Sequence, residues 1–82
     1  MVNVRIICWF KNSETFISTV ALKTGCAGDS KVAIRKVIDP YQSLTDPFGD
    51  IGTYDLYGFE ENVNKMIDYI EQGDYDVEII RC

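Results

Sequence analysis

The first ten residues alternate in character, and this pattern constrains the fold more than any other part of the sequence. Val2, Val4, Ile6, Cys8 and Phe10 fall on one face of an extended segment, because successive side chains of a strand point to opposite faces. The other face of this segment is only half polar. We therefore expect a strand whose apolar face belongs to the core.

A Thr- and Val-rich run, Glu14–Leu22, follows the turn residues Asn12 and Ser13. Its apolar residues Phe16, Val20 and Leu22 are in phase with a strand. The run therefore predicts a second strand, which forms a β-hairpin with the first.

A glycine-containing turn then precedes a segment with helical spacing. Asp29 or Ser30 can cap a short helix, and Pro40 ends it, because a proline disfavours the helical conformation in the residue before it. The apolar residues on one side of this predicted helix are Ala33, Ile34, Val37 and Ile38.

The segment Asp39–Gly58 contains both prolines, three of the six glycines, and aromatic residues among aspartates. Twenty residues without regular structure are unusual in a compact domain and are commonly functional. Within this segment, Thr53–Tyr57 alternates well enough to predict a short additional strand.

The clearest helix begins near Phe59 or Glu60, and we expect Gly73 to be the left-handed residue after its end. Its apolar residues recur at helical spacing: Phe59, Val63, Met66, Ile67 and Ile70. A last strand, Tyr75–Arg81, is predicted beside the first strand, with Arg5 and Glu78 as neighbours across the pair.

These elements predict one domain, residues 1–82, of the α+β class. We expect a sheet of three or four strands, built from the N-terminal hairpin and the C-terminal strand and covered by one long and one short helix. An apolar content of 46% is sufficient for a core in a chain of this length.

Composition argues against most catalytic and nucleic-acid-binding functions. The chain has no histidine, which removes the commonest general base and metal ligand, and it has no glycine-rich phosphate loop. We expect no cofactor and no metal. The formal net charge of −5 argues against nucleic-acid partners and anionic membranes, and it favours either a basic partner protein or mere solubility.

Three cysteines, Cys8, Cys26 and Cys82, form no closed disulfide framework, which fits a reducing cytoplasm. The N-terminal segment lacks the features of a signal peptide, and no run is long enough to span a bilayer. We expect a soluble cytoplasmic protein, with a monomer favoured.

The remaining candidates for function are surface residues. Trp9 has two interpretations: it is buried with Ile7 and Ile17 under covering helices, or it is an exposed anchor of an interface. The segment Asp39–Gly58, which we call the aromatic-acidic segment, is either a partner-binding surface or a structural loop. We expect this segment and the exposed face of the last helix to carry the contact. With Trp9, they supply the candidate contact residues Trp9, Phe48, Asp50, Tyr54, Asp55, Tyr57, Glu61, Asn64 and Asp68.

Two local patterns are distinctive. Val4–Asn12 reads Val-Arg-Ile-Ile-Cys-Trp-Phe-Lys-Asn and is followed by Ser-Glu-Thr-Phe, and Val63–Lys65 stands ahead of a C-terminal strand ending in Arg81 and Cys82. Together these patterns resemble the Dmd-like antitoxins of T-even-type bacteriophages. The resemblance covers about half of the chain, at its two ends. This chain has extra residues between them and lacks the tryptophan that the family carries near the start of its helix.

The resemblance implies a phage protein that enters a groove of a bacterial endoribonuclease toxin and blocks mRNA cleavage sterically. It also implies a contact role for Asn64, the counterpart of an asparagine on the family's helix. Three alternatives stay open. They are a phage anti-CRISPR or anti-restriction inhibitor that mimics nucleic acid, an enzyme that uses Cys26, and an assembly subunit.

Overall fold

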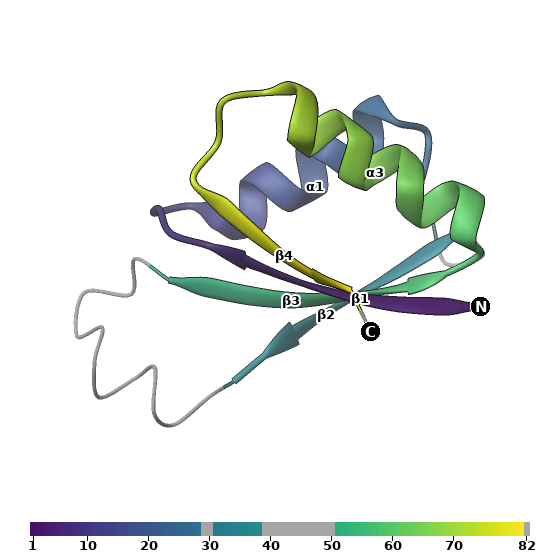
Figure 1. Ribbon diagram of the computed structural model, residues 1–82, viewed down its shortest axis with the longest axis horizontal. Coiled ribbons are helices and arrows are strands. Elements are labelled where there is room, and N and C mark those ends of the chain that lie inside the picture. Colours follow the sequence, from purple (N-terminus) through teal and green to yellow (C-terminus); the bar gives the residue numbers. More distant parts are fainter. Residues whose placement is uncertain (29–30, 39–50, 82) are drawn as a thin grey trace.

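The computed structural model describes residues 1–28, 31–38 and 51–81. The elements are β1 (Val2–Cys8), α1 (Ser13–Lys23), β2 (Val32–Val37), β3 (Gly52–Gly58), α3 (Glu60–Gln72) and β4 (Val77–Arg81). The strands form one antiparallel sheet in the order β2-β3-β1-β4, and both helices lie on the same face of it (Figure 1). The predicted α+β class, with up to four strands and two helices, is confirmed.

Each helix connects two parallel strands that are separated by a third strand. Helix α1 links β1 to β2 with β3 between them, and α3 links β3 to β4 with β1 between them. This βαββαβ order is the topology of the ferredoxin-like fold. Because that fold carries many unrelated functions, the topology alone assigns none to this chain.

The core lies between the sheet and the two helices. Val4, Ile6 and Cys8 of β1 are buried, so the alternation seen in the sequence does separate the covered face from the other one. The helices supply their own buried residues: Ile17, Val20 and Ala21 from α1, and Val63, Met66, Ile67 and Ile70 from α3. Each of the valine, isoleucine and methionine side chains among them contributes about 1.5–3 kcal/mol on full burial.

The prediction of an N-terminal hairpin is wrong, because the run after the first strand is helix α1. Its β-branched residues favoured a strand, but its buried residues Ser13, Ile17, Val20 and Ala21 have helical spacing. A helix is needed here to cover the apolar face of β1. Asn12, in the left-handed conformation with φ of 60°, turns the chain from the strand into the helix.

The predicted short helix is also wrong, since residues Val32–Val37 form strand β2. A short apolar run fits both periodicities, and here the β-branched residues pair with β3 from Val32↔Gly58 to Val37↔Thr53. The proposed caps, Asp29 and Ser30, and the proposed terminator, Pro40, lie outside the described residues.

The additional strand, the last helix and the last strand are confirmed as β3, α3 and β4, with β4 beside β1. Two details differ. Glu78 is opposite Ile7, whereas Arg5 is opposite Ile80 and Asp55, so Arg5 and Glu78 are only diagonal neighbours. Gly73 has φ of −91°, which any residue can adopt, so it is not a left-handed cap.

Candidate functional site

Helix α3 carries a row of polar residues on the flank that faces away from its buried stripe. Glu61, Asn64, Asp68 and Glu71 are three or four positions apart, which aligns them along the helix. The three carboxylates are exposed, and Asn64 is partly exposed. We call these four residues the acidic stripe. It includes Glu61, Asn64 and Asp68, which the sequence singled out as contact residues.

The stripe is held against strand β4 by one arginine. Arg81 Nη1 donates to Asn64 Oδ1 at 3.2 Å, and Arg81 Nη2 lies 3.8 Å from Glu71 Oε1. All three side chains are at the surface, so this network adds little to stability. It occupies the Oδ1 atom of Asn64, which accepts the hydrogen bond from Arg81.

A shallow hollow opens at the start of α3, next to the stripe. It has a volume of about 450 Å³ and is lined by Phe59, Glu60, Glu61 and Asn64. The sequence pattern placed Phe59 on the buried face of the helix, but its side chain is 58% exposed. Phe59 precedes the first residue of α3, where its carbonyl accepts hydrogen bonds from the amides of Asn62 and Val63. Exposed aromatic rings are typical anchors of protein-binding surfaces.

The charge of the chain is concentrated around this surface. Residues 60–82 contain seven of the thirteen acidic residues and two of the eight basic residues, so they alone carry the formal net charge of −5. All seven carboxylates are exposed. The remaining residues have no net charge. This asymmetry was visible in the sequence through the positions of the acidic residues, although total charge alone did not reveal it.

The second group of candidate residues lies on the sheet face that the helices leave uncovered (Figure 1). Asp55 and Tyr57 of β3 belong to this face, beside Arg5 of β1. Trp9 continues the β1–β4 register, with its amide donating to Asp76 O at 3.0 Å, which places it on the same face as Arg5. Its side chain is 46% exposed, so the interpretation of Trp9 as a core residue is wrong.

Asp55 is occupied on this face by an ion pair. Arg5 Nε and Nη2 donate to Asp55 Oδ1 and Oδ2 at 2.8 and 3.1 Å. The hydrogen bond from Arg5 holds the pKa of Asp55 below its ordinary value of 3.8, with a further contribution from the charge of Arg35. Both oxygens of the Asp55 carboxylate therefore bind Arg5 within the sheet, and a partner protein would have to compete with this ion pair to bind them.

One of the predicted contact residues, Tyr54, belongs to neither surface. Tyr54 is only 3% exposed and its hydroxyl shares a buried hydrogen bond with Ser13 Oγ at 2.7 Å, so we remove it from the candidate contact residues. Phe48 and Asp50 lie outside the described residues.

The described cysteines are buried thiols. Burial raises the pKa of Cys8 to about 11, and the Cys26 thiol donates to Asn62 O at 3.3 Å. A nucleophilic cysteine needs an accessible, stabilised thiolate, so Cys26 is not a candidate nucleophile. Within residues 1–28, 31–38 and 51–81, no group of three metal-ligating side chains comes together.

Comparison with protein families finds no matching family model, and comparison with curated proteins finds no matching sequence. Among the described residues, no helix combines the length and the apolar character needed to cross a membrane.

Proposed function

We propose that this protein is an inhibitor that occupies a basic, nucleic-acid-binding groove of a partner protein. The observation that carries the proposal is the acidic stripe of α3 together with Phe59. This surface combines three exposed carboxylates with an exposed aromatic ring, within the C-terminal residues 60–82 that carry the formal net charge of −5. Surfaces that bind nucleic acid are rich in lysine and arginine. A complementary negative surface speeds association with them and favours the correct partner.

The resemblance to Dmd-like antitoxins narrows the partner to a bacterial endoribonuclease toxin in the host cytoplasm. In this account α3 enters the groove of the toxin, and the carboxylates of the stripe meet the basic side chains that otherwise bind mRNA. Phe59 supplies the apolar anchor at the start of the helix. Cleavage stops because the substrate is excluded, and no residue of this chain takes part in a chemical step.

The same charge asymmetry supports a second candidate, an anti-restriction or anti-CRISPR inhibitor whose carboxylates imitate the phosphates of nucleic acid. The two candidates differ in how much of the affinity rests on charge. The affinity of a phosphate mimic rests on its carboxylates and falls steeply as salt is raised, whereas a groove-filling inhibitor also gains affinity from the apolar anchor Phe59 and loses less.

Co-expression with candidate bacterial endoribonuclease toxins tests the proposal. Growth rescue and a co-purified complex with one toxin are the expected results, and a salt series on that complex separates groove filling from charge mimicry. If no toxin is neutralised and none co-purifies, the antitoxin assignment fails. A complex with a restriction or CRISPR nuclease that dissociates at moderate salt would support the second candidate instead.

A further inference from the structure

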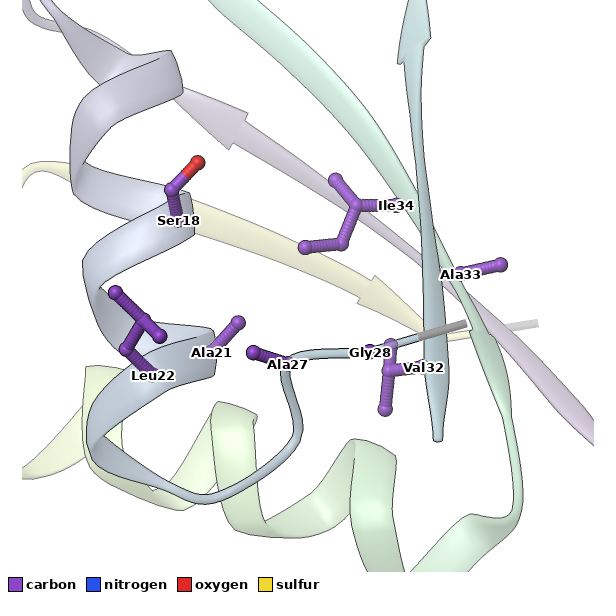
Figure 2. Close-up of a pocket in the computed structure, with 8 residues that line it drawn as sticks. All are labelled: Ser18, Ala21, Leu22, Ala27, Gly28, Val32, Ala33 and Ile34. Atoms are coloured by element: carbon purple, nitrogen blue, oxygen red, sulfur yellow. The ribbon is translucent and has the colours of Figure 1, made fainter. Parts of the chain in front are cut away.

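An apolar groove lies between α1 and β2, the edge strand at the other end of the sheet from β4 (Figure 2). Its volume is about 540 Å³. Helix α1 contributes Ala21 and Leu22, strand β2 contributes Val32 and Ile34, and Ala27 and Gly28 lie near its end. The side chain of Leu22 is 71% exposed and that of Ile34 is 38% exposed. Water therefore reaches apolar side chains that α1 leaves uncovered.

One wall of this groove is the edge of the sheet. Strand β2 is the outermost strand in the order β2-β3-β1-β4, and it pairs with β3 alone among the described residues. The outer side of an edge strand presents backbone N–H and C=O groups that can pair with one more strand. An extended peptide that binds in this way gains main-chain hydrogen bonds and places alternate side chains on the two faces of the sheet.

The edge is also the most basic part of the chain. Lys31, Arg35 and Lys36 are three of the eight basic residues, and all three are exposed. None of them is in a salt bridge with another described residue. Lysine on an edge strand ordinarily disfavours pairing of that strand with another chain. The effect is strongest when the incoming strand is also basic. Two copies of β2 side by side would bring six basic residues together, which disfavours a symmetric dimer through this edge.

The two faces of β2 differ in chemistry. Ile34 points toward α1 and the groove, whereas Ala33 points to the other side of the strand (Figure 2). Arg35 shares the side of Ala33 and pairs in register with Asp55 on the uncovered face of the sheet. An added strand would therefore place every second side chain in the apolar groove and the others next to Arg35.

We infer that β2 is a docking edge for an extended segment of a partner protein in which apolar and acidic residues alternate. The apolar side chains fill the groove between α1 and β2, and the carboxylates lie beside Arg35. This site is independent of the proposed inhibitory surface on α3, and it stands whether or not that surface binds a toxin.

The test uses an end-capped peptide of alternating valine and glutamate, and a matched peptide with lysine in place of glutamate. Amide chemical shifts of the full-length protein are followed by NMR during each titration. The glutamate peptide is expected to shift amides within residues 18–28 and 31–38, and the lysine peptide is expected to leave them unchanged.

Two variants test the assigned contacts. Arg35→Gln removes the charge beside the carboxylates, and Leu22→Gln makes the groove polar at an exposed position that the core does not need. Each variant is expected to raise the Kd for the glutamate peptide about tenfold, equivalent to about 1.4 kcal/mol. Lys65→Gln on α3 is the matched control for charge and is expected to leave affinity unchanged.

Three results would overturn the inference. The first is equal binding of the two peptides, and the second is a set of shifts confined to α3 or β4. The third is a dimer in solution whose β2 amides are protected from exchange before any peptide is added, because the occupant would then be a second copy of this chain.

Discussion

Arg5 and Asp55 face each other directly across strands β1 and β3, and their side chains form a two-point ion pair on the uncovered face of the sheet. Paired donors on a planar guanidinium match the two oxygens of a carboxylate, which gives the contact a fixed geometry. The pair joins the N-terminal strand to its central neighbour in the register that also aligns the core residues Ile6 and Tyr54.

Replacing Asp55 by asparagine is expected to lower the free energy of unfolding by about 0.5–1 kcal/mol at pH 7, since the pair is partly exposed. The pKa of Asp55 is lower in the folded protein than its ordinary value of 3.8. Its contribution is therefore complete above pH 3.8 and is lost as the pH falls through the lowered pKa. Urea unfolding of both proteins should show a difference at pH 7 that shrinks below pH 3.8.

The control for this experiment is Asp74→Asn, which changes an exposed carboxylate in the turn after α3. A difference between the native protein and Asp55→Asn that does not depend on pH would contradict the role assigned to the ion pair.

The hydrogen bond between Ser13 and Tyr54 connects the start of α1 to β3 inside the core. Tyr54→Phe leaves the buried Ser13 hydroxyl without this partner, and the expected cost is about 1–2 kcal/mol. Ser13→Ala is expected to cost a similar amount. In a double-mutant cycle measured by urea unfolding, the loss of unfolding free energy in the double variant should be smaller than the sum of the losses in the two single variants. Strict additivity of these losses would show that the two hydroxyls do not interact.

Gly58 pairs with Val32 where β2 meets β3, and a Cβ atom there would lie 2.5 Å from the backbone oxygen of Lys31. A backbone carbonyl cannot rotate away as a side chain can. Gly58→Ala is therefore expected to destabilise the fold by about 1–3 kcal/mol. Chemical unfolding measures this cost, and a variant as stable as the parent would contradict the assignment of residues 32–37 as a strand in this register.

The buried thiols of Cys8 and Cys26 are expected to resist alkylation in the folded protein. Burial raises the pKa of Cys8 from 9.0 to about 11, so its thiol stays neutral at pH 8. The folded protein therefore holds this proton more tightly than the unfolded chain, and stability falls as the pH rises from 9.0 toward 11. Peptide mapping after iodoacetamide treatment tests both sites; labelling at the rate of a free thiol without denaturant would contradict their burial.

The sequence predicted those elements whose periodicity allows one interpretation. Strand β1 alternates cleanly, and α3 repeats its apolar residues at helical spacing over three turns. The exchange of helix and strand at α1 and β2 has two causes. The β-branched residues of α1 favoured a strand, and the short apolar run of β2 fits both periodicities. Their assignment depends on tertiary partners: β1 needs a covering helix, and β3 needs a second neighbour in the sheet.

Much of each candidate surface could not be predicted from the sequence, because it depends on the same long-range arrangement of helices and strands. The exposure of Asp68 followed from helical spacing, which places this residue off the apolar face of α3. The contact of Asn64 with Arg81, the burial of Tyr54 and the groove beside β2 did not. Each of these requires knowledge of which elements are neighbours, and the sequence pattern left that open at α1 and β2.

The most direct test of the inhibitory surface compares two charge reversals, Glu61→Lys and Glu14→Lys. Both residues are exposed and lie in the first turn of a helix, so both changes carry a similar cost in stability, and only Glu61 belongs to the acidic stripe. Growth rescue and co-purification are measured with the toxin that the parent protein neutralises. The account predicts that Glu61→Lys abolishes rescue and that Glu14→Lys retains it; equal rescue by the two variants would contradict it.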